Sequence, residues 1–211
     1  MRRRMEGSGE QPLMADGMNR RKIAEWVARG IAETGIEGTF SSVSCSTAGD
    51  EPSLGISQWE GERAGRLLAA IPGGGIFSGI SYSRLSGEGR IPALSALLGS
   101  AAGRAAQMRM LAEDAASYAE ALLAEGFFSS PPCVVYAGMW CPTSVSVVCA
   151  FLRNRAHRAQ LDSLWPLHRL FRAEYAQAAD VMAYEAGYHR RAEVTYRWVS
   201  GLFSLGGGEA A

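Results

Sequence analysis

One carboxylate and a nearby group of small polar side chains have the residue types needed for acid–base chemistry. Glu37 is followed by Gly, Thr and Phe, and a little further along stands the string SLGISQW, residues 53–59. Cleavage of a glycosidic bond needs a proton donor at the leaving oxygen, and either a nucleophilic carboxylate or a water held on the opposite face. Glu37 is the best proton donor in this segment, so these residues favour hydrolysis of a sugar polymer.

The second catalytic group has several candidates. Asp50 and Glu51 are the nearest further carboxylates, although the sequence Asp-Glu-Pro is also typical of a turn. Ser53 offers a small hydroxyl that could hold a water opposite Glu37. Each of these residues also has a purely structural interpretation, as a turn or a surface side chain.

A helix and a hairpin must position these groups. Asn19 is a plausible N-cap, and apolar residues at Ile23, Val27 and Ile31 share one helical face, which predicts a helix from about residue 19 to about residue 35. If that helix continued to Glu37, the carboxylate would lie within about 40° of the same face. Partial burial of this kind is the environment that a general acid requires.

The remaining pattern is mostly helical. Residues 39–57 read as short strands around a turn, and residues 72–90 as a long loop. Helices are expected at about 60–71, 92–98, 103–125, 160–185 and 189–203, with a buried helix at 134–152 broken near Pro142. With 211 residues and 47% hydrophobic content, the chain predicts a flexible leader at 1–17, one domain at 18–205 and a flexible tail at 206–211.

Charge and hydropathy exclude several classes of partner. The 21 basic and 21 acidic side chains cancel, so neither nucleic acid nor an anionic membrane is expected as a partner. Arginines cluster near the N-terminus and at 153–172. These clusters are either solvated helix faces or a surface that attracts an anionic polymer such as a bacterial wall. No apolar run reaches about 18 residues and no signal peptide is visible, so no membrane insertion is expected.

Other catalytic chemistries lack their residues. The four cysteines show no C-x-x-C spacing and no neighbouring histidine pair, so a zinc site is not expected. Hydrolysis of a glycosidic bond by carboxylates needs neither a metal nor an organic cofactor. The three histidines fall on the late helices, away from any G-x-S-x-G elbow. Residues 73–75 lack the lysine of a phosphate-binding loop.

The Glu37-Gly38 pair and the string at 53–57 resemble the lysozyme-like superfamily. In phage-type lysozymes a helix ends in Glu-Gly, and a hairpin carries an Asp followed by a Thr-Ile-Gly-Ile-Gly run. The resemblance implies that Glu37 is the general acid and that Ser53 positions the water. It also implies an α+β, mostly α-helical fold, in which a small β-hairpin lobe packs against a helical lobe.

A closer likeness is to phage and bacterial cell-wall hydrolase domains of the endolysin type, which carry a Ser-x-Gly-x-x-Gln-Trp motif. In that family a later helix carries a Gln and an Asp–Tyr pair, and an aromatic residue follows. The resemblance implies substrate-binding roles for Gln58, Trp59, Gln107, Asp114, Tyr118 and Tyr136.

Two departures from the family pattern leave the second catalytic group open. Counted back from Ser53, the hairpin Asp of the family falls on Thr47, so Asp50 or Glu51 would have to substitute. After Tyr136, residues 137–142 read AGMWCP in place of an acid and an Asn-Gln. The choice between inverting and retaining chemistry therefore stays open.

The resemblance implies a bacteriolytic glycosidase that cleaves the β-1,4 links of peptidoglycan. The protein would be made in the cytoplasm and would act on the cell wall after release or delivery by another machine. A chitosanase or chitinase is a close alternative. A catalytically inactive glycan-binding or structural module is a rival from another class, and a purely helical interaction protein is a third. The oligomeric state is left open.

Overall fold

The computed structural model describes residues 19–155 and 161–205, and the segments expected to be flexible, 1–17 and 206–211, lie outside this range. The described chain is mostly helical, with a small antiparallel sheet of two strands. The helices are α1 Arg20–Thr34, α2 Gly61–Ala69, α3 Tyr82–Gly87, α4 Ile91–Gly99, α5 Ala101–Ala124, α6 Pro131–Gly138, α7 Val145–Arg153, α8 Leu164–Ala178 and α9 Glu185–Leu205. The strands are β1 Val43–Cys45 and β2 Pro52–Leu54, and short 3₁₀ turns occupy η1 Gly55–Ser57, η2 Gly74–Phe77 and η3 Met182–Tyr184.

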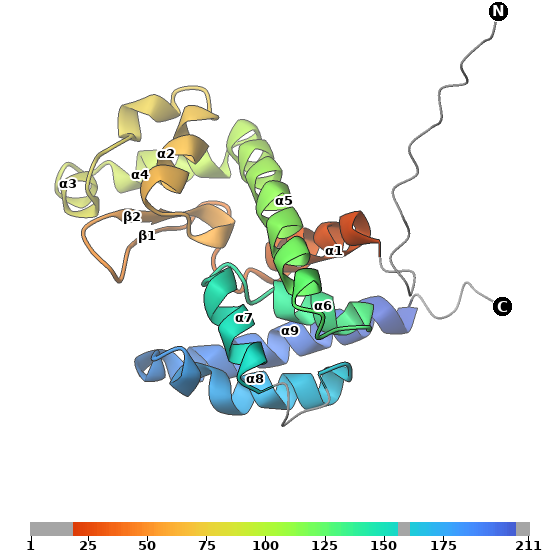
Figure 1. Cartoon of the computed structure of the whole chain (residues 1–211). Helices are drawn as coiled ribbons and strands as arrows, with labels where there is room; N and C mark the ends of the chain where they lie inside the picture. Colours follow the sequence, from red (N-terminus) through yellow and green to blue (C-terminus); the bar gives the residue numbers. More distant parts are fainter. Residues whose placement is uncertain (1–18, 156–160, 206–211) are drawn as a thin grey trace, which may run out of the picture.

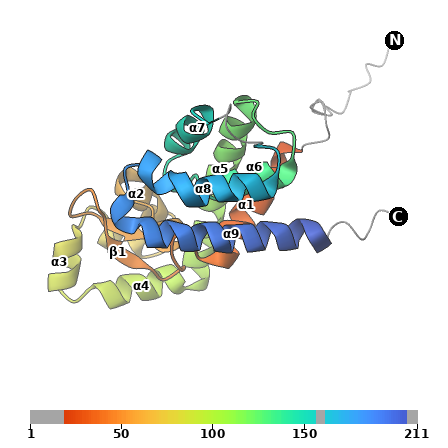
Figure 2. The same ribbon diagram turned by 90° about the horizontal axis from the view of Figure 1, so that it is seen from below.

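The elements form two lobes joined by the long helix α5 (Figure 1). The hairpin lobe contains β1, β2, α2, α3 and α4, at the upper left of Figure 1. The helical lobe contains α6 to α9, with α8 and α9 side by side (Figure 2). Helix α1 packs on α5 and also contacts α6 and α9, so the chain segment that leaves α1 runs between the lobes.

Helix α1 begins and ends close to the predicted residues. The Asn19 side chain accepts a hydrogen bond from Lys22 N, and Ile23, Val27 and Ile31 form the buried face. Gly35 ends the helix in the left-handed conformation, with φ of 59°, which glycine adopts without a steric penalty. The helix therefore stops before Glu37, and helical phase does not orient that carboxylate.

The predicted hairpin is present and short. Val43 pairs with Leu54, and Ser44 pairs with Ser53, in an antiparallel register. Leu54 is fully buried, and it also forms an isolated bridge with Trp59. This bridge folds residues 55–58 back over the end of the hairpin.

The segment expected to be one long loop, residues 72–90, contains η2 and the short helix α3 instead. The Ser81 side chain accepts a hydrogen bond from Arg84 N, and Leu85 is fully buried against the lobe. Capping and burial of one leucine outweigh the high Gly and Ser content that indicated a loop. The helix expected at 134–152 is interrupted near Pro142 as predicted, giving α6 and α7. No helix in the described ranges is long and apolar enough to cross a membrane.

Candidate functional site

The Glu37 side chain lies where the chain passes between the lobes. It follows the αL cap at Gly35, and its side chain is 17% exposed. Its Oε1 atom is buried and forms an ion pair with Nη1 of Arg191, from α9, whose side chain is 7% exposed. The contact is an ion pair without the alignment of a directed hydrogen bond.

Other contacts fix the Arg191 guanidinium in place. Nη2 donates to the Met139 carbonyl oxygen at 2.8 Å, and Nη1 donates to Oγ1 of Thr143 at 3.1 Å. The guanidinium also lies 4.9 Å from the centre of the Trp140 ring, within cation–π range. The end of α6 and the turn before α7 therefore hold the cation that faces Glu37.

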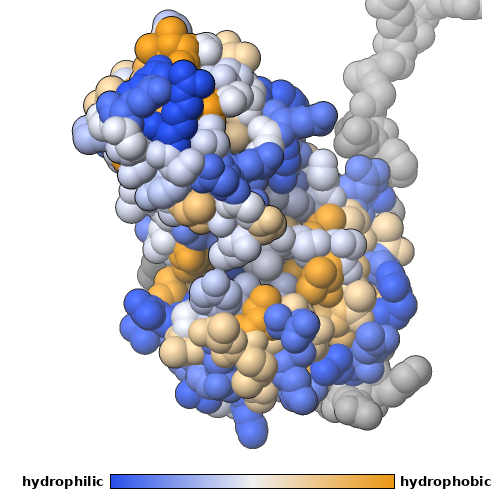
Figure 3. Space-filling model, turned by 90° about the vertical axis from the view of Figure 1, so that its left-hand side faces the viewer, coloured by the Kyte–Doolittle hydropathy of each residue, from blue (hydrophilic) through white to orange (hydrophobic). Residues whose placement is uncertain are grey.

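Glu37 opens onto a pocket of 440 Å³ between the lobes. Thr47, from the hairpin loop, lines one wall, and Thr143, Tyr184, Tyr188 and Arg191 come from the helical lobe. The remaining lining residues are Ile36, Val181 and Gly187. In Figure 3 the surface is indented between the upper hairpin lobe and the lower helical lobe. Among the described residues, Glu37 is the one carboxylate that lines this pocket.

Two tyrosines give this pocket an aromatic wall. Tyr184 is 55% exposed, whereas Tyr188 packs parallel to Trp140 at a centroid distance of 6.0 Å. Burial raises the pKa of Tyr188, and the nearby Arg191 partly opposes that shift. The Tyr188 phenol is therefore a neutral hydrogen-bond donor and acceptor at physiological pH.

The glycines of the two strings form a tight junction, which we call the hairpin interlock (Gly38, Gly55, Gln58 and Gln107). A Cβ atom on Gly38 would lie 2.8 Å from the Gly55 carbonyl oxygen and 2.9 Å from Nε2 of Gln58. Nε2 of Gln58 donates to the Gly55 carbonyl oxygen at 2.8 Å, and the Ser44 hydroxyl donates to Oε1 of Gln58. The glycines thus allow the backbones of the two strings to meet.

Gln107 of α5 fixes the other side of the interlock. It is fully buried, accepts a hydrogen bond from Ile56 N at 3.0 Å, and donates to the carbonyl oxygens of Phe40 and Leu98. A Cβ atom on Gly55, where φ is 71°, would lie only 2.2 Å from Oε1 of Gln107. In this structure Gln107 ties three backbone segments together.

Trp59, Asp114 and Tyr118 form a second link between the hairpin lobe and α5. The indole Nε1 of Trp59 donates to Asp114 at 2.8 Å, and Arg63 pairs with the same carboxylate. Burial, with a smaller contribution from Asp114, raises the pKa of Tyr118 to about 12. Trp59 is 2% exposed and Tyr118 is 6% exposed, so both lie mainly in the protein interior.

Tyr136 lies in the core of the helical lobe. It has no exposed surface, and its hydroxyl is 3.4 Å from Nδ1 of His168. Its ring packs edge-on against Phe171 at 5.5 Å. The structure therefore leaves Tyr136 no surface with which to contact a sugar.

The structure does not bring the three candidates for the second catalytic group into the Glu37 pocket. The Ser53 hydroxyl donates to Glu60, and Ser53 is 4% exposed. Asp50 accepts hydrogen bonds from the backbone and hydroxyl of Ser83 at the start of α3, and these bonds lower its pKa. Asp50 and Glu51 line a different pocket, also of 440 Å³.

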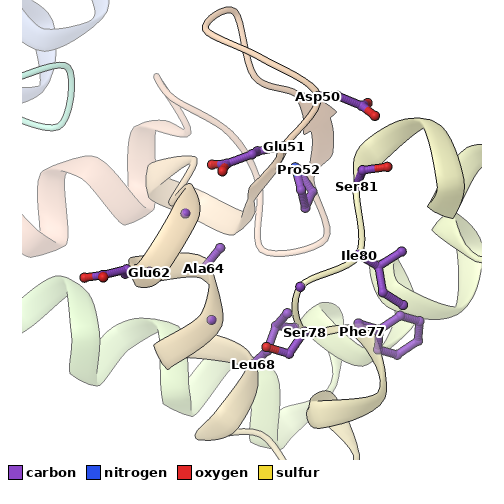
Figure 4. A pocket seen from close by; sticks show the side chains of 13 residues that line it. Asp50, Glu51, Pro52, Glu62, Ala64, Leu68, Phe77, Ser78, Ile80 and Ser81 are labelled. Carbon is purple, nitrogen blue, oxygen red and sulfur yellow. The ribbon is translucent and has the colours of Figure 1, made fainter.

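That second pocket lies within the hairpin lobe, between β2, α2 and residues 77–81 (Figure 4). Leu68, Phe77 and Ile80 line it alongside Pro52. In Figure 4 the Asp50 side chain points away from α2, towards the side of Ser81. Asp50 and Glu51 thus line a pocket to which Glu37 does not contribute.

Sequence reasoning missed the groups that surround Glu37 from the helical lobe. These groups come more than eighty residues after the Glu37-Gly38 pair and the string at 53–59; they are Thr143, Tyr184, Tyr188 and Arg191. One signal was available in the sequence. A single face of α9 carries Tyr188, Ala192, Thr195 and Val199, and Arg191 borders that face, which indicates that this side of α9 packs against the rest of the protein. Thr47, the position to which the hairpin Asp of the family was traced, does line the pocket.

Within the described ranges, no group of three or more His, Cys, Asp or Glu side chains is placed to hold a metal ion. Comparisons of this chain with protein families, with curated proteins and with solved structures gave no match. The pocket itself is therefore the basis for a functional assignment.

Proposed function

We propose that this protein is a lysozyme-like glycoside hydrolase that cleaves the β-1,4 links of peptidoglycan, with Glu37 as the general acid. The observation that supports this proposal is the position of Glu37. Its carboxylate lines a pocket between a hairpin lobe and a helical lobe, with hydroxyl and aromatic side chains around it. Such a pocket offers a sugar both hydrogen-bonding groups and a stacking surface.

In the proposed reaction, Glu37 gives its proton to the glycosidic oxygen as the bond to the sugar carbon breaks. The proton transfer leaves a negative charge on the Glu37 carboxylate. Arg191 is held in place by Met139 and Thr143, so its positive charge is already oriented towards that carboxylate. A preorganised charge of this kind stabilises the developing anion without reorganisation.

The pocket favours direct attack by water. A retaining enzyme needs a second carboxylate about 5–5.5 Å from the first to act as the nucleophile. Among the described lining residues Glu37 is the sole carboxylate, whereas the Thr47 and Thr143 hydroxyls can hold a water. We therefore expect inversion of configuration at the sugar carbon.

A second candidate is a glycan-binding module without turnover. The lack of a second carboxylate in the described pocket lining, together with the Glu37–Arg191 ion pair, favours this alternative. In such a module the ion pair would position a sugar hydroxyl and would not transfer a proton.

The decisive experiment is release of reducing sugar from purified peptidoglycan by the native chain and by Glu37→Gln. We expect Glu37→Gln to lose at least about 100-fold in rate, the scale of a general-acid contribution. Glu33→Gln is the matched control, because Glu33 is an exposed α1 carboxylate that pairs with Arg29.

Each other outcome argues against part of the proposal. Full activity in Glu37→Gln would show that another group is the acid. No release by a folded native chain that still sediments with the cell wall would leave the binding module. Unfolding curves of both variants establish that any loss is not a loss of folding.

A further inference from the structure

The Glu37 pocket continues along α9 into a second hollow. This hollow, of 250 Å³, is lined by Thr34, Gly35, Ile36, Gly187, Arg190, Arg191 and Val194. Ile36, Gly187 and Arg191 line both hollows. The two hollows therefore adjoin, and we call them together the α9 trough.

Gly187 keeps the trough open at the point where the hollows join. A Cβ atom on Gly187 would meet no atom within 4 Å, so the space beside it is empty. A ligand seated against Glu37 therefore meets no side chain beside Gly187, where the two hollows join.

The two arginines of the trough differ in their charge balance. Arg191 is buried and forms an ion pair with Glu37. Arg190 is exposed, and it has no ion pair or hydrogen bond within residues 19–155 and 161–205. The other side chains that line the second hollow, apart from Arg191, are uncharged. The far end of the trough thus carries one uncompensated positive charge.

We propose that Arg190 binds a carboxylate of the substrate, and that the substrate is a glycan with carboxylate-bearing substituents, such as the peptides attached to peptidoglycan. The planar guanidinium matches a carboxylate with two parallel hydrogen bonds. Chitin carries no such charge, and chitosan carries amino groups that Arg190 would repel. This inference rests on the proposed function, and it selects peptidoglycan over the two other polymers.

The expected effect is modest, because Arg190 is exposed to solvent. The loss of one exposed ion pair typically lowers affinity by about 2- to 5-fold. Replacing the cation by an anion removes the attraction and adds repulsion, so Arg190→Glu should weaken binding by about 10-fold at low salt, and less at high salt.

The test measures the affinity of the native chain, Arg190→Glu and Arg197→Glu at low temperature for three soluble ligands. The ligands are a peptidoglycan oligosaccharide with its attached peptides, the same oligosaccharide with its carboxylates amidated, and a chitin oligosaccharide of equal length. Arg197 is the matched control, because it is exposed on the same helix outside the residues that line the trough.

We expect only Arg190→Glu to weaken binding of the carboxylate ligand, and amidation to abolish the difference between Arg190→Glu and the native chain. Equal losses in the two variants would overturn the inference, since the effect would then be general charge. So would equal affinity of the native chain for all three ligands. Reducing-sugar release distinguishes failure of this inference from failure of the proposed function. Cleavage of peptidoglycan without a binding preference for the carboxylate ligand overturns only the role of Arg190. A binding preference for the carboxylate ligand without cleavage overturns the proposed hydrolase activity and keeps the Arg190 site.

Discussion

A Cβ atom on Gly55 would lie 2.2 Å from Oε1 of Gln107, whereas one on Gly187 would meet nothing within 4 Å. The first glycine belongs to the hairpin interlock and the second lines the α9 trough. The interlock has no room for a further methyl group at Gly55, so a change there must displace the Gln107 side chain from its hydrogen bonds. The trough wall has free space, so a change there should alter ligand binding before it alters the fold. If the trough binds the ligand as proposed, stability and ligand binding depend on different residues.

The largest expected effect is that of Gly55→Ala. The new methyl group would collide with Gln107, and φ of 71° is strained for any residue with a Cβ. We expect the free energy of unfolding to fall by about 3 kcal/mol or more, measured by denaturant unfolding.

The matched control for that substitution is Gly49→Ala in the hairpin loop. A Cβ there meets nothing within 4 Å, and Gly49 is not among the glycines with positive φ. We expect a change within about 0.5 kcal/mol. Similar losses in both variants would contradict the distinction between a filled interlock and an open loop.

The sequence predicted the elements that local patterns determine. The cap at Asn19, the stop at Gly35 and the short strands on either side of Asp50 all follow from side-chain chemistry within a few residues. The helix α3 was missed because the segment is rich in Gly and Ser, whereas its formation also depends on the burial of Leu85, which has no exposed surface. Sequence periodicity cannot show such a contact.

The candidate site was less predictable, because it joins segments that are far apart in the chain. Gln107, Asp114 and Tyr118 were singled out together with the hairpin string, and the structure does bring Gln107 and Asp114 into contact with it. Their contacts here are hydrogen bonds inside the protein. Arg191 could not be paired with Glu37 from sequence, since nothing local to either residue indicates the other.

A smaller effect on the free energy of unfolding is expected when the pH is lowered, and it comes from a buried histidine of the helical lobe. His168 of α8 is 2% exposed, and burial lowers its pKa against the opposing influence of Glu193, at 3.6 Å. The neutral histidine is therefore the form that the folded helical lobe favours. Arg172, which pairs with the same Glu193, adds a further positive charge near it.

Because the pKa of His168 is lower in the folded chain than in the unfolded chain, the unfolded chain binds more protons between the two values. Stability should therefore fall as the pH drops below about 6.5, by at most about 1.4 kcal/mol per pH unit. Unfolding of the native chain and of His168→Gln between pH 7.5 and pH 5 measures this slope, with His189→Gln as control. An unchanged slope in His168→Gln would contradict this origin of the pH dependence.

The smallest expected change in stability is that of Gly187→Ala, and its sign is opposite to that of Gly55→Ala. Gly187 is helical and has free space, so a methyl group should raise the free energy of unfolding by about 0.5 kcal/mol through a less flexible unfolded chain. Gly201→Ala, on the same helix and equally unhindered, should give a similar gain. The larger pair Gly187→Trp and Gly201→Trp then isolates the trough, because only a side chain at 187 fills the space beside Glu37 and Arg190. Loss of glycan affinity in Gly187→Trp alone would place the ligand in the trough, whereas equal affinity in both would exclude that region as the binding site.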